Sequence, residues 1–336
     1  MNKFLKFSCL LAGMLLSGLA RADGGFLFAT FRGERTPMSE QIYFATSTNG
    51  RSWTVLGDGK PILVSTLGTK GVRDPFLVRS PDGRKFWLIA TDLSVHFLEH
   101  NWRKAAREGS KSIVVWESTD LVKWSEPWLA KVSPEDAGCT WAPQAIFDPE
   151  TEDYLVYWSS VNGRDQFGKF RVWATRTKDF KTYGEPFIYI EQADPIIDTD
   201  IVHDGQKYHR FTKNERHTLI YQESAEKLAG PWTKVETFSL ATTKGYEGPQ
   251  CFLLTPASAT QPAVWCLLLD FFTRGQGYQA FVTTDLATGK FEPAGDFRFP
   301  YRFRHGAVLS ITAEELERLS QAYPNSAPST QPSSGR

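Results

Sequence analysis

Three acidic residues and one histidine are the side chains in this sequence best suited to chemistry. Asp74 lies in RDPF, Asp198 in DTDIV, Glu247 in YEGP and His305 in FRHG, each at the start of a short apolar run. Two carboxyl groups in different surroundings can supply one protonated acid and one ionised base. Hydrolysis of a glycosidic bond needs this pair, because the leaving oxygen takes a proton while a base activates water. These residue types therefore predict acid–base hydrolysis, provided that the fold brings them together.

Each of these residues taken alone also has an ordinary structural interpretation. Asp74 before Pro75 is typical of a strand entry or a turn, Asp198 can cap a turn, and Glu247 can be an exposed loop acid. A single histidine such as His305 is more often a satisfied core residue. What favours function is that all four start equivalent segments of a repeated pattern.

The repeated pattern consists of two alternating sequence elements. One element is a strand, a Ser/Thr-polar turn and an aromatic residue, and it recurs five times at a spacing of about 60 residues. Its copies end at Trp53, Trp124, Tyr183, Trp232 and Phe291. The other element is two strands joined by a tight turn such as Pro-Asp-Gly or His-Asp-Gly. Its copies begin at Asp74, Ala142, Asp198 and Glu247. One copy of each element makes a unit, and each unit is therefore expected to form four antiparallel strands.

The fifth unit is divided between the two ends of the sequence. HGAVLSI after His305 supplies a first strand, and GGFLFATFRGE near the N-terminus supplies a strand with nothing before it. We therefore predict an all-β fold, a five-bladed β-propeller closed by pairing of N-terminal and C-terminal strands in the last blade. Two stacked β-sandwiches are the alternative, but they would not predict five copies or a divided fifth one. In the ring, the starting residues of the first strands meet at one mouth of the axial channel.

The two ends of the chain lack the repeated pattern. Residues 1–22 have a positively charged start, a short apolar stretch and small residues at a cleavage site, which predicts a secretory signal peptide. The catalytic propeller is expected at 23–318, and the Pro/Ser-rich segment 319–336 is expected to be a disordered tail. Only 101–109 and 313–321 show a helical pattern.

Composition excludes several classes of partner. The 38 Lys and Arg residues balance 38 Asp and Glu residues, which argues against a nucleic-acid binder. The rest of the chain has no apolar run long enough to span a membrane, so we expect a soluble, exported monomer that is periplasmic or secreted. Cys251 and Cys266 lie in runs that predict neighbouring strands, where a disulfide and two buried thiols are equally compatible.

At the residues with chemical potential, the sequence resembles glycoside hydrolase family 43, whose five-bladed propeller enzymes act mainly on arabinofuranosides and xylosides with inversion. The resemblance covers about residues 24–314 and rests on RDPFLVRS, WAPQAIFDPETEDYLVYWS, IIDTDIVHDGQKYHRF, YEGPQ and FRHGAV. It implies that Asp74 is the general base and Glu247 the proton donor. Asp198 would be the third carboxylate, which orients the donor and raises its pKa.

The resemblance also implies which residues contact the sugar and where an ion would lie. Trp141 would contact the sugar, and His305 would lie on the axis near a water-ligated ion, often calcium. No cofactor is required for the chemistry itself. The remaining substrate-binding candidates, which lie beside these motifs or in the insertion 96–111, are Arg73, Phe76, Trp102 and Arg304.

One departure from the family pattern concerns the third carboxylate. The family usually has Pro after this Asp, whereas Thr199 follows here and Asp200 comes next. Strand alternation places Asp198 and Asp200 on the same face, so both are candidates, and we favour Asp198.

The expected function is an inverting, exo-acting α-L-arabinofuranosidase that releases terminal sugars from plant-type polysaccharides. A β-xylosidase or an exo-β-galactosidase on the same scaffold is the alternative, because pocket loops set specificity. A non-catalytic carbohydrate-binding propeller would need one of the three acids replaced or turned away. A hydrolase that uses His305 as a direct metal ligand is disfavoured, because no second histidine stands at a blade start.

Overall fold

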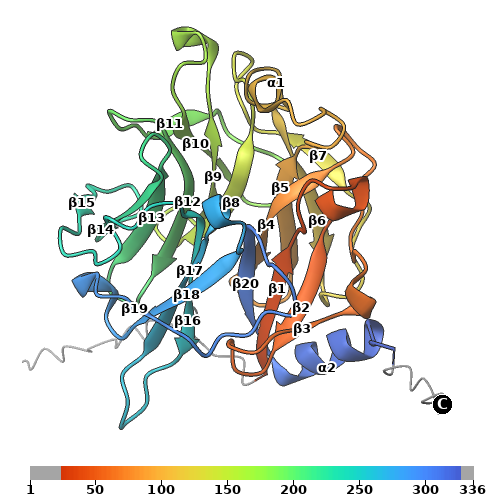
Figure 1. Ribbon diagram of the computed structural model, residues 1–336, viewed down its shortest axis with the longest axis vertical. Coiled ribbons are helices and arrows are strands. Elements are labelled where there is room, and N and C mark those ends of the chain that lie inside the picture. The colour runs from red at the N-terminus through yellow and green to blue at the C-terminus, as the bar shows by residue number, and fades with distance from the viewer. Residues whose placement is uncertain (1–23, 327–336) are drawn as a thin grey trace, which may run out of the picture.

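The computed structural model describes residues 24–326, which form twenty strands in five antiparallel sheets of four strands each (Figure 1). The first strands β4, β8, β12, β16 and β20 each contact the first strand of the next sheet, and together they enclose an axis. This arrangement is a five-bladed β-propeller, which confirms the predicted fold.

The blades follow one another along the chain. Blade one contains β4 (Val72–Arg79), β5 (Phe86–Asp92), β6 (Ser112–Ser118) and β7 (Trp128–Lys131). Blade two contains β8 (Trp141–Asp148), β9 (Asp153–Ser160), β10 (Arg171–Thr177) and β11 (Phe187–Ile190). Blade three contains β12 (Ile196–His203), β13 (Tyr208–Asn214), β14 (Leu219–Ala225) and β15 (Thr233–Lys234). Blade four contains β16 (Glu247–Thr255), β17 (Val264–Asp270), β18 (Tyr278–Thr283) and β19 (Glu292–Pro293). Blade five contains β20 (Gly306–Ile311), β1 (Gly25–Thr30), β2 (Tyr43–Ser47) and β3 (Thr54–Val55). The α-helices are α1 (Trp102–Arg107) and α2 (Ala313–Ala322), where a helical pattern was predicted.

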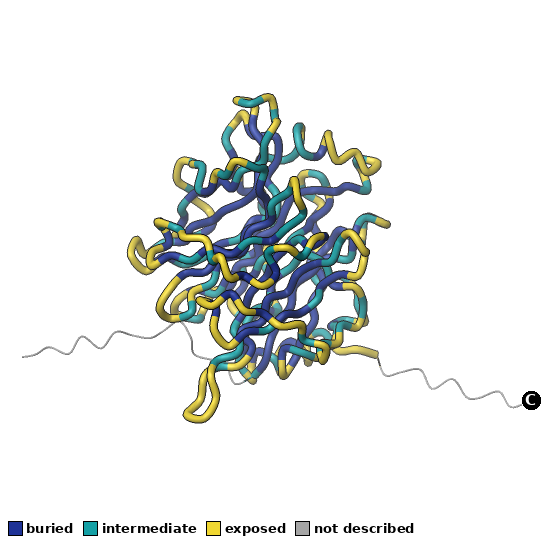
Figure 2. Tube along the Cα trace, turned by 60° about the vertical axis from the view of Figure 1, so that its left-hand side comes forward, coloured by how far each residue is buried: buried dark blue, intermediate teal, exposed yellow. Residues whose placement is uncertain are grey.

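The turns between strands match the turn residues of the sequence. In the β4–β5 hairpin, Gly83 has a φ of 74° and its N–H donates to the carbonyl of Ser80. In the polar turns that follow the third strands of blades one, two and five, a Ser or Thr hydroxyl accepts from a backbone N–H three residues on, as Ser118 does from Leu121 at 2.9 Å. Figure 2 shows the result, with buried strands and exposed turns.

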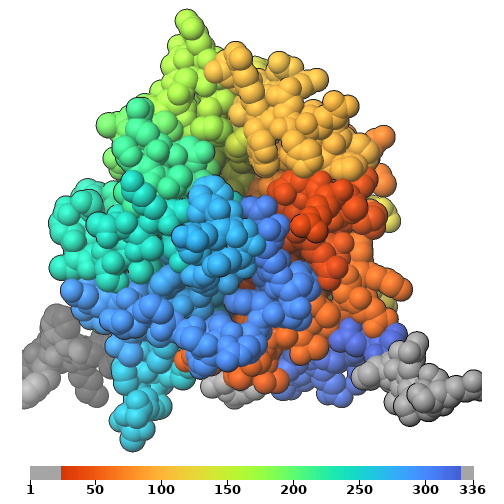
Figure 3. All heavy atoms as spheres, viewed as in Figure 1, coloured from red at the N-terminus to blue at the C-terminus, as the bar shows by residue number. Residues whose placement is uncertain are grey.

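The ring closes through β20 and β1, as predicted. These strands pair antiparallel from Gly25 opposite Ile311 to Thr30 opposite Gly306. The two ends of the described chain therefore adjoin in one blade, where blue and red atoms meet in Figure 3. After β20 the chain enters α2, whose start is capped by the reciprocal hydrogen bonds of Thr312 and Glu315.

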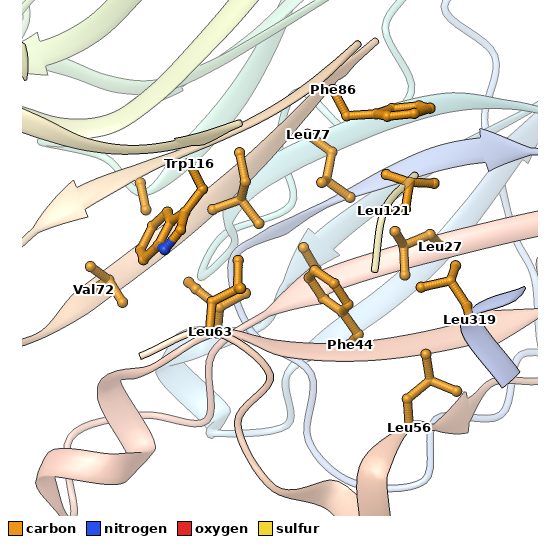
Figure 4. Packing of buried hydrophobic residues seen from close by; sticks show 14 of the residues in the cluster. Leu27, Phe44, Leu56, Leu63, Val72, Leu77, Phe86, Trp116, Leu121 and Leu319 are labelled. Carbon is orange, nitrogen blue, oxygen red and sulfur yellow. The ribbon is translucent and has the colours of Figure 1, made fainter. Parts of the chain in front are cut away.

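The hydrophobic core is divided into one large cluster at each interface between neighbouring blades. Each of the five repeated aromatic residues packs in a different one of these clusters. They are Trp53, Trp124, Tyr183, Trp232 and Phe291. Figure 4 shows the cluster between blades five and one, where Leu27 and Phe44 meet Leu77. Leu319 of α2 joins the same cluster and is fully buried.

Several expectations outside the strands can be compared with the structure. Helix α2 continues through Ala322, so the ordered domain extends past residue 318, because Leu319 and its neighbours pack on the core. The predicted signal peptide and the end of the predicted tail lie outside the described residues. Within 24–326, Cys251 and Cys266 are buried free thiols, which settles the disulfide alternative. No helix in that range is long and apolar enough to cross a bilayer.

Leu319→Ala should lower the free energy of unfolding by about 2–5 kcal/mol, because it leaves a cavity where α2 covers the closing interface. Urea unfolding followed by tryptophan fluorescence measures this change. Ser320→Ala, on the exposed side of the same helix turn, is the matched control and should stay close to the parent protein. Equal stability of Leu319→Ala and the parent would contradict the role of α2 in closure.

Candidate active site

Four inner strands share the same irregularity next to the mouth of the channel. The pairing register of β4, β8, β12 and β16 with the second strand of each blade shifts at this point. The residue at the shift has a left-handed backbone, with φ of 49° at Asp74, 48° at Ala142, 54° at Asp198 and 56° at Gly248. A bulge re-aims the side chain of its extra residue. Asp74, Ala142 and Asp198 therefore line one hollow on the axis.

The fourth blade corrects one sequence expectation. The residue equivalent to Asp74 and Asp198 is Gly248, and Glu247 comes one position earlier. A Cβ on Gly248 would lie 1.7 Å from Cδ2 of His305, so only glycine leaves room for the imidazole. At this position blade four has no side chain, and the imidazole of His305 from blade five fills the space.

His305 connects two of the three predicted carboxylates. Its Nδ1 lies 3.0 Å from Oδ1 of Asp74, and its Nε2 lies 3.5 Å from Oδ2 of Asp198. Burial alone would lower the pKa of His305, but the Asp198 and Asp74 carboxylates outweigh it and raise this pKa to about 9. The imidazole is therefore cationic at neutral pH.

Asp74 and Asp198 have opposite protonation preferences. Burial would raise the pKa of Asp74, but the hydrogen bond and charge of His305, with help from Thr91, lower it to about 2. Burial raises the pKa of Asp198 to about 6 despite His305, and the negative charge of Glu247 adds to the rise. Asp74 is therefore a ready base, while Asp198 holds a proton over part of the acidic to neutral range.

Glu247 is surrounded by cations. Lys213 Nζ lies 3.0 Å from Oε2 and Arg304 donates to Oε1 at 3.0 Å. Burial would raise the pKa of Glu247, but Lys213, His305 and Arg304 lower it below its ordinary value. In the free site these cations therefore act against the expected effect of Asp198, which is to raise the pKa of Glu247. The acid with fewer cationic contacts, Asp198, has the raised pKa instead.

Two predicted arginines hold carboxylates that the sequence analysis missed. Arg304 donates at 3.0 Å to both Asp270 and Glu34, and Arg73 donates to Glu34 at 2.7 Å. Asp270 ends the apolar run WCLLLD and pairs with Glu247 in the strand register, which is the signal that would have identified it. Arg73 and Arg304 thus position acids, and direct sugar binding by them stays a prediction.

A third missed acid, Glu40, holds the base of the insertion between β5 and β6. It is fully buried and accepts from Ser94 Oγ at 2.7 Å and from the backbone N–H groups of Val95 and His96. It also lies 3.3 Å from Arg73. The insertion is therefore tied to the residue that precedes Asp74.

Asp200 occupies a different place from Asp198. It is buried behind the hollow and accepts a hydrogen bond from the backbone N–H of Cys251 at 2.7 Å. Burial raises its pKa to about 7. Because Asp198 lines the hollow and Asp200 links blades three and four, Asp198 is the better candidate for the third carboxylate.

The predicted aromatic candidates lie around the mouth. Phe76 lines the hollow beside Asp74. Trp141, at the start of β8, is half-buried, and its ring meets the exposed ring of Trp102 edge-on, with centroids 6.1 Å apart. The Trp102 ring also lies 5.2 Å from the guanidinium of Arg73. These rings form an aromatic wall on the side of blades one and two.

The axial hollow has a volume of about 20 Å³, which is room for one water molecule beside Asp74. His305 does not fit the role of a metal ligand here, since both of its ring nitrogens face carboxylates. Within residues 24–326, no group of three or more His, Cys, Asp or Glu side chains has a metal-binding arrangement. The calcium ion stays an expectation from the resemblance.

The ion pairs of His305 should make stability depend on pH. Its folded pKa of about 9 lies above the ordinary value of 6.5, so its contribution is complete below about pH 6.5 and is lost as pH rises through 9. We expect the free energy of unfolding to fall between about pH 6 and about pH 10, with a share on the order of 2–3 kcal/mol from this group. Urea unfolding at both pH values measures the fall.

His305→Gln should remove this share of the pH dependence, although it also destabilises the protein at every pH by leaving two buried acids without their cation. His217→Gln is the control, because His217 is about half exposed and should leave the pH dependence intact. The same fall in His305→Gln and the parent would show that another group causes it.

Comparisons with known proteins show the family of this chain. A family described as "Probable glycosyl hydrolase domain", related to glycoside hydrolase family 43, matches residues 23–317. An α-L-arabinofuranosidase of Bifidobacterium longum subsp. longum is 27% identical over 312 residues, which cover 80% of this chain but only 28% of that relative's length.

Solved structures of glycoside hydrolases are also among the proteins to which this chain is similar. The catalytic domain of the Coprinopsis cinerea family-62 α-L-arabinofuranosidase is 12% identical, with 73% of this chain and 75% of that chain covered and a TM-score of 0.47. The exo-β-1,3-galactanase of Phanerochaete chrysosporium, solved with galactose, is 17% identical, with 69% and 53% covered and a TM-score of 0.49.

Proposed function

Because the chain belongs to the glycosyl hydrolase family related to glycoside hydrolase family 43, we propose that it is an inverting, exo-acting α-L-arabinofuranosidase. The observation that carries the proposal is that Asp74 and Asp198 line the axial hollow together with Gly248, the residue next to Glu247, so that three blades bring the three acids to one mouth of the axis. The preference for arabinose rests on the Bifidobacterium relative, of which this chain spans about a quarter.

Asp74 is proposed as the general base. Its low pKa keeps it ionised at neutral pH, and the hollow that it lines has room for one water molecule. His305 fixes Oδ1 and Thr91 donates to Oδ2 at 2.8 Å, so the carboxylate is held in one orientation. A fixed, ionised carboxylate next to a water-sized hollow is suited to taking a proton from an attacking water.

Glu247 is proposed as the proton donor, with the proton drawn from the pair that it forms with Asp198. Asp198 Oδ2 accepts from the N–H of Gly248, the residue next to Glu247, at 3.3 Å. Such neighbours titrate as a pair, so the proton that Asp198 holds in the free site is available to Glu247 when sugar binding removes water around it. Lys213 and Arg304 then orient the donor and stabilise its carboxylate after the proton has left.

The alternatives predict different results in the same assays. A β-xylosidase or exo-β-galactosidase keeps the three acids and differs in the sugar that it accepts. A carbohydrate-binding propeller would bind sugar without turnover. Export to the periplasm or medium and a monomeric state are proposed alongside the activity, and the proposal of export rests on the N-terminal sequence, which has the pattern of a signal peptide.

Purified protein should release 4-nitrophenol from the aryl α-L-arabinofuranoside faster than from the matching xyloside and galactoside. Asp74→Asn and Glu247→Gln should each lower kcat by about 10²–10⁴-fold on an alkyl arabinofuranoside. On the nitrophenyl substrate, Glu247→Gln should lose much less than Asp74→Asn, because a good leaving group needs little protonation. ¹H NMR of the first sugar released should show the inverted anomer.

Glu236→Gln is the matched control for these variants, because Glu236 is exposed and pairs only with surface Lys234 among the residues described. Full activity of Glu247→Gln on the alkyl substrate would exclude Glu247 as donor. Retention of configuration would exclude Asp74 as the base. Sugar binding without turnover on every substrate would favour the binding propeller.

Lys213→Met should move the alkaline limb of kcat/KM to higher pH. The Asp198–Glu247 pair must hold one proton, so activity falls as pH rises and the pair loses it, and the charge of Lys213 lowers the pKa of both carboxyl groups. A pH–rate profile measures the limb, and Lys207→Met on the exposed β12–β13 turn is the control. An unchanged limb in Lys213→Met would contradict the assignment of that limb to this pair.

A further inference from the structure

A second hollow lies beside the mouth, between α1 and the loop that joins β9 to β10. It has a volume of about 410 Å³, within the range of ligand sites. It is lined by Asn101, Arg103, Lys104, Arg107, Glu108 and Phe167. Figure 1 shows α1 and this loop at the same edge of the molecule, and Figure 3 shows their orange and yellow-green atoms side by side.

The hollow carries an excess of positive charge that nothing in residues 24–326 neutralises by contact. Arg103 and Lys104 are exposed and Arg107 is half-buried. In that range, no salt bridge to a carboxylate involves any of the three side chains. Glu108 is the one acid in the described lining.

Other cations close to these loops are already paired. Arg164 lies 3.7 Å from Asp136, and Lys169 lies 2.8 Å from Glu191. Since the whole chain has 38 basic and 38 acidic residues, the free cations of the hollow are a local feature and not a consequence of bulk charge.

Aromatic rings connect this hollow with the candidate active site. Trp102, next to Arg103 on α1, contacts Arg73 on one side and Trp141 on the other. The Trp141 ring in turn lies 5.4 Å from Phe170, in the loop that also carries Phe167. Aromatic faces next to a few charged groups are typical of sites that bind a polar ligand with apolar surfaces, as a sugar chain has. A chain with its end at the axis can therefore continue across this wall.

We propose that the hollow binds the carboxylate of a uronic acid residue in the polysaccharide that the enzyme trims. Arginine forms bidentate hydrogen bonds with carboxylates, and the neighbouring lysine adds a flexible positive charge. The proposal rests on the proposed function, since it takes the ligand to be the substrate chain, and it narrows the substrate class to acidic polysaccharides.

The test measures binding, and it uses the Glu247→Gln protein so that no polysaccharide is consumed. Native gels that contain a glucuronate-bearing arabinogalactan are compared with gels that contain the same polysaccharide after its carboxylates have been reduced to alcohols. We expect at least about tenfold tighter binding to the acidic form, because several exposed ion pairs act together. Raising the salt concentration should weaken this preference.

Replacing Arg103, Lys104 and Arg107 together by Gln should abolish the preference for the acidic polysaccharide. Binding to the reduced polysaccharide should remain, which also shows that the variant is folded. Arg103→Gln alone, on an exposed position, should lose part of the preference and covers the case in which the triple variant does not fold.

The charge-matched control replaces three exposed lysines in turns at the opposite end of the propeller. They are Lys123, Lys178 and Lys290. This control should keep the preference. Equal binding of both polysaccharides by the parent, a preference that survives in the triple variant, or an equal loss in the control would each overturn the proposal. Failure of the proposed hydrolysis appears separately, in the aryl glycoside assays.

Discussion

Everything at the axis depends on the antiparallel pairing of β20 with β1, because this pairing brings His305 to Asp74 across 231 residues of sequence. The imidazole then lies between Asp74 and Asp198, in the space that Gly248 leaves open. Without this cation the two buried carboxylates would face each other without compensation, which is costly in a low-dielectric site. Closing the ring and assembling the site are therefore one event.

The distribution of cations decides which acid holds a proton. Glu247 contacts Lys213 and Arg304, and Asp74 contacts His305 at hydrogen-bond distance. Asp198 has a longer contact with His305 and is buried next to the negative Glu247, so its pKa rises. Three carboxylates that look similar in the sequence thus differ in the structure: the pKa values of Asp74 and Glu247 are lowered, and the pKa of Asp198 is raised.

The bulge in the inner strands explains why the sequence repeat predicts the positions of some site residues correctly and the position of another incorrectly. Asp74, Ala142 and Asp198 begin equivalent segments and occupy equivalent places, as the repeat predicts. Glu247 does not, because the bulge of blade four falls on Gly248. A one-residue offset reverses the face on which a strand side chain lies. This is why Glu247 faces Lys213 and Arg304 rather than the centre of the hollow.

The sequence by itself determined the architecture, because the five turn-and-aromatic repeats and the divided fifth unit can be recognised from the order of residues alone. It also identified the three acids and His305. Only the tertiary structure decided their partners, because Lys213, Asp270 and Glu34 come from different blades and carry no shared motif. Protonation depends on burial and on distances between such groups, and both are set by how the blades pack against one another.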